Sequence, residues 1–209
     1  MTVESVAVVD HPLVKHHLAR LRDATTAPAE FRQVVQRLSV LLAYEATQDL
    51  ALETIEVRTP LTITGGHRLT PRIGLVPILR AGLGMVDPML DLIPDSEVWH
   101  LGLYRDEATA RPVEYYSKLP PGQPVDVALV VDPMLATGGS ASLALEALQQ
   151  WGVPRTKLLS LIAAPEGIEA VRSRFPETSV HICAVDQRLD DRKFIVPGLG
   201  DAGDRIFNT

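Results

Sequence analysis

The sequence predicts an α/β fold in which a mainly parallel sheet is flanked by helices. Short apolar runs rich in β-branched residues alternate with segments whose apolar residues recur at helical spacing. The predicted strands cover residues 73–79, 98–104, 125–131, 158–163 and 180–185. The chain has 209 residues with 46% hydrophobic content, which suffices for one compact core. Because strands joined by helical crossovers run parallel, we expect a single domain over residues 1–209 built on such a sheet.

Two helices are predicted before the first of these strands. Apolar residues recur at helical spacing within residues 14–21 and again within residues 31–42. Pro28 stands just ahead of the second pattern, and a proline is tolerated in the first turn of a helix. The amino-terminal part is therefore expected to cover the sheet with two helices.

Two segments interrupt the alternation. Residues 57–70 form two short β-rich runs around Gly65-Gly66, which is typical of a hairpin. An isolated two-stranded ribbon is marginally stable in water, so we expect this arm to pack on something. Residues 105–121 are polar, rich in proline and without an apolar period. Long irregular segments in compact domains often close over substrates, and this one is predicted to be a flexible lid.

The segment VALVVDPMLATGGSASLALEAL joins a buried strand, an acid, a polar turn and a helix. Asp132 stands at the end of the strand, and Thr137, Gly138, Gly139 and Ser140 supply hydroxyls and unhindered amides. A phosphate there meets free N–H groups and the positive end of the helix dipole. No lysine follows the glycines, which excludes the GxxxxGKS loop. The segment predicts a phosphate cradle whose acid suits ribose hydroxyls; the alternative for Asp132 is a turn or capping acid.

A second candidate site follows the strand predicted at residues 73–79. Arg80 and the amides around Ala81, Gly82 and Gly84 fall at the carboxyl edge of the sheet, where open α/β folds bind ligands. The guanidinium of an arginine can hold two oxygens of an anion at once. The alternative is a solvated arginine ahead of a glycine turn.

Five segments together resemble type I phosphoribosyltransferases, and the residues within these motifs resemble those of the uracil branch of that family. In chain order they are HPLVKH (11–16), LLAYEATQDL (41–50), VPILRAGLGM (76–85), VDPMLATGGS (131–140) and PGLGDAGDRIF (197–207). The resemblance therefore covers essentially the whole chain. It implies the transfer of a ribose phosphate from 5-phosphoribosyl 1-diphosphate (PRPP) to uracil, giving UMP and pyrophosphate.

The resemblance also implies residue roles. Arg80 and Arg105 would hold the diphosphate of PRPP, Asp132 would hold the ribose hydroxyls, and Asp201 would face PRPP or its Mg²⁺. These four residues are the candidate catalytic residues. The implied PRPP-binding set comprises them and the loop residues Pro133, Met134, Leu135, Ala136, Thr137, Gly138, Gly139 and Ser140.

The carboxyl-terminal segment contains Gly198, Gly200 and Gly203, a literal GxGxxG. Only six residues follow Gly203, so there is no room for the helix, second strand and acid of a dinucleotide site. What remains is a loop whose backbone groups can read the edge of a flat pyrimidine. By the resemblance, residues 186–209 form the uracil-binding segment, with the base lined by Ile195, Gly200, Asp201 and Ala202.

The metal expectation follows from a departure from the family pattern. Asp132 is followed by Pro133, whereas many type I members carry two adjacent acids at this point. Mg²⁺ is therefore expected to arrive bound to PRPP, and no residue is assigned as a certain metal ligand. The six histidines also lack the spacing of a zinc site.

Composition sets the remaining expectations. The lone Cys183 excludes an internal disulfide and suits a reducing compartment, and no apolar run approaches the roughly 20 residues of a membrane span. The net charge of −6 argues against a protein that lives on nucleic acid. We expect a cytoplasmic enzyme of small-molecule substrates that binds neither nucleic acid nor membrane. We also expect a homodimer or higher homo-oligomer, because the family's arm reaches a partner subunit.

Two alternatives stay open on the sequence alone. One is an RNA-binding regulator of pyrimidine genes on the same fold, and the other is an effector sensor without turnover. The residues also do not decide whether GTP activates the protein.

Overall fold

The computed structural model describes residues 6–105, 112–117, 119–120 and 122–209. A seven-stranded sheet runs through its centre in the order β1-β11-β10-β8-β4-β5, with β9 beside β10. Every pair in this sheet is parallel. Its strands are β1 (Val6–Val8), β4 (Ile73–Pro77), β5 (Glu97–Val98), β8 (Val127–Val131), β9 (Met134–Leu135), β10 (Arg155–Ala163) and β11 (Ser179–Val185). The predicted parallel sheet is confirmed, and β1 was not predicted.

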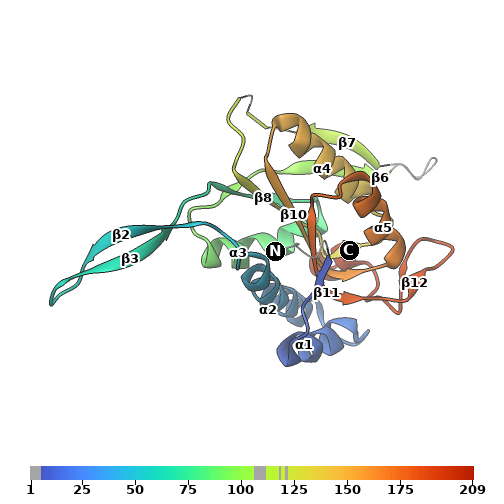
Figure 1. Ribbon diagram of the computed structural model, residues 1–209. Coiled ribbons are helices and arrows are strands. Elements are labelled where there is room, and N and C mark those ends of the chain that lie inside the picture. Colours follow the sequence, from blue (N-terminus) through green and yellow to red (C-terminus); the bar gives the residue numbers. More distant parts are fainter. Residues whose placement is uncertain (1–5, 106–111, 118, 121) are drawn as a thin grey trace.

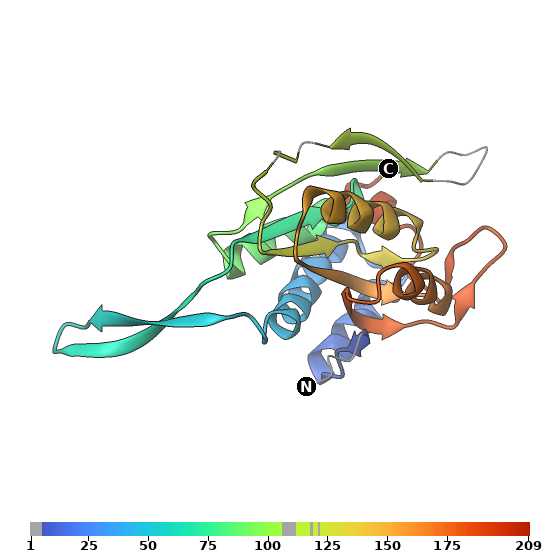
Figure 2. The same ribbon diagram turned by 45° about the horizontal axis from the view of Figure 1, so that its top comes forward.

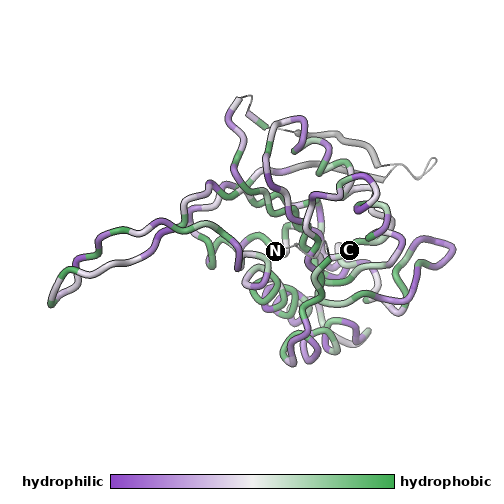
Figure 3. The backbone as a smooth tube through the Cα atoms, in the orientation of Figure 1, coloured by the Kyte–Doolittle hydropathy of each residue, from purple (hydrophilic) through white to green (hydrophobic). Residues whose placement is uncertain are grey.

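Helices cover both faces of the sheet (Figure 1). On one face lie α1 (Pro12–Arg22), α2 (Pro28–Ala46), the 3₁₀ turn η1 (Ala81–Met85), α3 (Val86–Leu92) and α6 (Ala202–Phe207). On the other face lie α4 (Gly139–Trp151) and α5 (Pro165–Arg174). Alternate residues of β8 serve the two faces: Leu129 packs on the first side and Val130 on the second. Both side chains are buried, which explains the continuous apolar strands of the sequence, and the hydropathy colouring in Figure 3 shows the same pattern.

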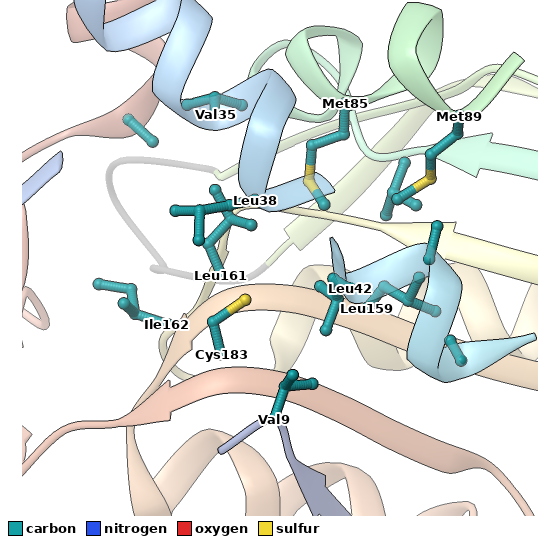
Figure 4. Packing of buried hydrophobic residues seen from close by; sticks show 14 of the residues in the cluster. Val9, Val35, Leu38, Leu42, Met85, Met89, Leu159, Leu161, Ile162 and Cys183 are labelled. Carbon is teal, nitrogen blue, oxygen red and sulfur yellow. The ribbon is translucent and has the colours of Figure 1, made fainter. Parts of the chain in front are cut away.

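The core between α2 and the sheet is made of interlocking aliphatic side chains (Figure 4). Leu38 and Leu42 of α2 lie near Leu159 and Leu161 of β10, and methionines from η1 and α3 fill the adjoining space. Cys183 belongs to this cluster, and burial raises the pKa of its thiol to about 12. The single cysteine is therefore an unreactive packing residue at neutral pH.

The hairpin arm projects away from the rest of the protein (Figure 1). It consists of β2 (Leu52–Arg58) and β3 (Ile63–Leu69), which pair antiparallel and form a sheet of their own. The arm therefore begins at Leu52, five residues before the predicted range of residues 57–70.

The predicted turn of the arm at Gly65-Gly66 is wrong. The chain reverses over residues 59–62, where the Thr59 hydroxyl accepts the N–H groups of Leu61 and Thr62, and both glycines lie inside β3. A Cβ at Gly66 would lie 2.5 Å from Val57 Cγ2 on the facing strand. At least the second glycine thus serves a close cross-strand contact.

A second hairpin is formed by β6 (Leu101–Arg105) and β7 (Pro112–Ser117). Figure 2 shows it alongside α4, apart from the central sheet. The strand predicted over residues 98–104 is thus divided between β5 and β6. The expectation that residues 105–121 are irregular throughout is also wrong, because residues 112–117 pair with β6. The remainder of that lid prediction, residues 106–111, 118 and 121, lies outside the described residues.

The carboxyl-terminal segment starts with a small antiparallel pair, β12 (Arg188–Leu189) and β13 (Ile195–Val196), and ends in α6. A loop alone was predicted after residue 197, so the helix is a correction. Within the described part of the chain, none of the helices is long and apolar enough to cross a membrane.

Candidate functional site

The segment predicted to be a phosphate cradle lies between β8 and α4. Gly138 precedes the helix with φ +76, and a Cβ there would lie 2.8 Å from the carbonyl oxygen of Gly167. Only glycine fits this position without strain. Gly139 starts α4, and its N–H points to the Thr137 hydroxyl at 3.4 Å. The first amides of a helix have no partner within the helix, so this turn presents N–H groups to an anion.

The residues between Asp132 and the cradle are tied to the sheet. Pro133 and Leu135 are buried, and the Pro133 carbonyl accepts the N–H groups of Leu161 and Ile162, both at 3.1 Å. Met134 and Leu135 form β9 and pair with β10. Any contact of Pro133 or Leu135 with PRPP is therefore left to the backbone, and the assignment of residues 133–136 to PRPP binding stays a prediction.

Asp132 is half-buried at the carboxyl end of β8. Burial raises the pKa of its carboxyl to about 7, and repulsion from Asp201 acts in the same direction. The Met134 N–H, 3.5 Å from Oδ1, opposes that shift and has a larger effect on the pKa than the repulsion from Asp201. The structure thus brings the predicted pair Asp132 and Asp201 to one site although they are far apart in the sequence. A carboxyl that titrates near neutrality at a sheet edge is typical of a functional site.

Arg80 follows β4, which is the neighbour of β8 in the sheet. A Cβ at Gly82 would lie 2.5 Å from the carbonyl oxygen of Val131, so glycine allows η1 to pack directly on the end of β8. This close approach places Arg80 on the same edge as Asp132. The Arg80 side chain is 61% exposed and hence accessible to a ligand.

The carboxyl-terminal helix completes this edge. A Cβ at Gly203 would lie 3.2 Å from Asp201 Oδ1 and 3.9 Å from Arg80 Nη2. Asp201 caps α6 by accepting the N–H of Asp204 at 3.0 Å. Asp204 in turn faces Arg80, and sequence analysis missed it. The available signal was the capping pattern Asp-x-x-Asp, which predicts the start of a helix.

The four residues predicted to line uracil differ in what they expose. Ile195 is buried in β13 and Ala202 is fully buried at the start of α6. Gly200 and Asp201 are exposed, and Gly200 has φ +81. The loop can therefore offer backbone groups around Gly200, while Ile195 and Ala202 support it from the core.

Arg105 is the last residue of β6, in the hairpin beside α4. Its side chain lies outside the described part, so its predicted contact with diphosphate stays a prediction.

Comparisons with known proteins agree with these features. The family model described as uracil phosphoribosyltransferase matches residues 8–209. A uracil phosphoribosyltransferase of Roseiflexus sp. (strain RS-1) is 59% identical over 204 residues, which cover 98% of each chain. One from Thermoanaerobacter sp. (strain X514) is 51% identical over 207 residues, covering 99% of each. A solved structure of a protein from Aquifex aeolicus shares 37% identity over 97% of both chains, with a TM-score of 0.91.

Proposed function

The chain belongs to the uracil phosphoribosyltransferase family, and we propose a role for each site residue in the transfer of ribose 5-phosphate from PRPP to uracil. The predicted family and the pentosyltransferase activity are confirmed by these relatives. The observation that carries the assignment of roles is the meeting of Arg80, Asp132 and the α4 cradle with α6 at one sheet edge.

In the proposed reaction, N1 of uracil forms a bond to C1 of the ribose as the bond from C1 to the diphosphate oxygen breaks, and the N1 proton passes to the departing diphosphate. The α4 cradle holds the 5′-phosphate far from the reacting bond, so that its binding energy serves positioning. Asp132 accepts hydrogen bonds from the two ribose hydroxyls, and only the ionised carboxylate offers both oxygens purely as acceptors. Arg80, together with Arg105, stabilises the charge that develops on the leaving diphosphate.

Magnesium is proposed to enter as part of the PRPP substrate. Among the described residues there is no group of three His, Cys, Asp or Glu side chains that could hold a metal ion unaided. Asp201 is an exposed carboxylate at this edge, and its oxygens would suit a Mg²⁺ ion carried by PRPP. Bound in this way, the ion supplies charge neutralisation to the diphosphate.

Uracil is proposed to lie against the loop of residues 195–202. Gly200 has no side chain to hold the base away, and its exposed peptide groups can pair with the alternating donors and acceptors of uracil. Asp201 joins this loop to the PRPP side of the site through its proximity to Asp132.

The β6–β7 hairpin is proposed to act as the lid. It pairs only with itself among the described strands and contacts α4, whose first turn is the phosphate cradle. PRPP should slow amide hydrogen exchange in residues 105–121; equal exchange with and without PRPP would exclude closure.

Assembly and location are proposals as well. The arm carries exposed apolar side chains, and Leu61 at its tip is 95% exposed, which supports a contact with a second copy of the chain. The buried free thiol of Cys183 suits a reducing cytoplasm.

The deciding experiment is a steady-state assay of pyrophosphate release from PRPP with uracil, cytosine, hypoxanthine or orotate. Release with uracil well above release with the other three is expected. Binding of uracil and PRPP without pyrophosphate release would favour the effector sensor. Tight RNA binding without turnover would favour the regulator.

A further inference from the structure

An ion pair that the reaction does not use ties the uracil-binding segment to α1. Asp186 follows β11, and its side chain is only 3% exposed. Its Oδ1 accepts Arg22 Nη2 at 2.5 Å, and its Oδ2 accepts Arg22 Nη1 at 2.8 Å. Because Arg22 is the last residue of α1, the pair joins the end of that helix to the end of a central strand.

Both backbone groups of Gly198 are held by this pair. The Gly198 N–H donates to Asp186 Oδ2 at 2.8 Å, and its carbonyl accepts Arg22 Nη1 at 2.8 Å. Gly198 has φ +65, and a Cβ there would lie 2.1 Å from the carbonyl oxygen of Ile195. The turn that leads into Gly200 is therefore fixed by two side chains from outside the loop.

A third side chain holds the next residue. Arg205 Nη1 donates to the carbonyls of Leu199 and Leu21, at 2.8 Å and 2.7 Å. Its Nη2 donates to the carbonyl of Asp23 at 2.6 Å, and its guanidinium lies 4.3 Å from the centre of the Phe31 ring. Residues 198 and 199 are thus both attached to the end of α1.

We infer that Arg22 and Asp186, assisted by Arg205, are positioning residues that set uracil selectivity through the backbone of residues 198–202. This inference rests on the proposed function. A backbone reader has no rotamer to adjust, so a displaced loop presents its donors and acceptors in the wrong places to every base. Buried ion pairs are weak contributors to stability and are retained in several proteins for conformational specificity, which suits such a role.

The test compares Arg22→Lys and Asp186→Asn with Arg20→Lys. Arg20 lies on the same helix and pairs with Glu30 through two nitrogens, and among the described residues no hydrogen bond or ion pair joins its side chain to the loop. In the first two variants, KM for uracil should rise about tenfold and the uracil-to-cytosine ratio of kcat/KM should fall about tenfold, because misplaced polar groups weaken discrimination. KM for PRPP should change less than about twofold, and Arg20→Lys should leave all three values unchanged.

A second readout does not depend on turnover. Amide hydrogen exchange at Gly198 should be faster in Arg22→Lys and in Asp186→Asn than in the parent protein, while exchange in the central strands should be the same in all three proteins. If KM for uracil and KM for PRPP rise together, or exchange rises throughout the protein, the pair is merely structural and the inference is overturned. If the parent protein itself releases no pyrophosphate with uracil, the proposed function fails instead. Unchanged exchange at Gly198 then overturns the positioning role separately.

Discussion

Arg80 Nη2 lies 3.4 Å from Asp204 Oδ1, an ion pair between the loop after β4 and the carboxyl-terminal helix, 124 residues apart in the sequence. Both side chains are more than half exposed, so the pair is weak and leaves the guanidinium accessible to the diphosphate that we propose as its ligand. Arg80 therefore lies at the edge of the candidate site with its guanidinium held near Asp204, a residue that the sequence analysis did not single out.

The first prediction uses the two partners separately. Arg80→Ala should lower kcat/KM for PRPP by about 100-fold or more, because a charged donor to the developing diphosphate charge is lost. Asp204→Asn should change it by less than about fivefold, since an exposed ion pair contributes little. Steady-state kinetics with varied PRPP measures both. An Arg80→Ala enzyme within about threefold of the parent would remove Arg80 from the diphosphate site.

The second prediction concerns pH. The pKa of Asp132 is raised to about 7, so the free enzyme loses its carboxylate acceptor as the pH falls below that value. We expect kcat/KM for PRPP to fall about tenfold per pH unit below pH 7, and Asp132→Asn should be slower and lack this dependence. A profile of the parent enzyme that is flat between pH 5 and 7 would contradict the role.

The same carboxyl predicts a stability effect. The unfolded chain loses this proton near its ordinary pKa of 3.8, well before the folded protein does. This group therefore lowers the free energy of unfolding as the pH rises from about 4 to about 7, and Asp132→Asn removes that contribution.

The third prediction concerns base selectivity. Cytosine replaces an acceptor by a donor and a donor by an acceptor, so backbone groups that pair with uracil would clash with it. Each unsatisfied buried group costs about 1 to 3 kcal/mol, and uracil should be preferred about 100-fold or more in kcat/KM. Comparable values for the two bases would show that residues 195–202 do not read the base.

A bulky residue at position 202 should act on every base. Ala202 is fully buried at the start of α6, so Ala202→Leu overpacks the support of the loop and should lower turnover with uracil and cytosine alike. Phe207→Ala, at the exposed end of the same helix, should leave turnover with each of the two bases within about threefold of the parent protein. A melting temperature for each variant separates loss of the site from loss of the fold.

The fourth prediction tests the arm. Leu61→Asp places a charge at the exposed tip and should shift a homodimer toward monomer at micromolar concentration, as measured by light scattering. Leu13→Asp, at an exposed leucine of α1, is the control and should leave the mass unchanged. A parent protein that is monomeric under these conditions would contradict the proposed assembly.

The fifth prediction concerns the buried Lys157 of β10, which pairs with Asp49 and donates to the carbonyl of Ala46 at 2.5 Å. Burial lowers the pKa of this lysine. Asp49→Asn leaves the ammonium without its counter-ion and should cost about 1 to 3 kcal/mol in urea unfolding. Glu30→Gln, which breaks an exposed pair, should cost less than about 1 kcal/mol; an equal loss in both would contradict the argument.

Local sequence determined the strands and the segment predicted to be a phosphate cradle. The strands β4, β8 and β10 are buried on both faces, so their apolar runs identify them without knowledge of their neighbours. The cradle is likewise local, because the strand, Gly138 and the helix dipole lie within one short segment. The substrates uracil and PRPP were inferred from the family resemblance, because apolar periodicity indicates secondary structure and not the identity of a ligand.

The tertiary structure decided what depends on neighbours distant in the chain. Gly66 was predicted to lie in the turn of the arm, but it lies inside β3. A side chain at this position would collide with Val57 on the facing strand. The short strand β1 is formed by pairing with β11. A run of three apolar residues is too short to show the periodicity from which a strand could be predicted. The pKa of Asp132 and the pairing of Arg80 with Asp204 arise from desolvation and from charges over 60 residues away in sequence. Sequence patterns indicate the local backbone conformation and which side chains are buried. A pKa shift or an ion pair between distant residues depends instead on which parts of the folded chain come into contact.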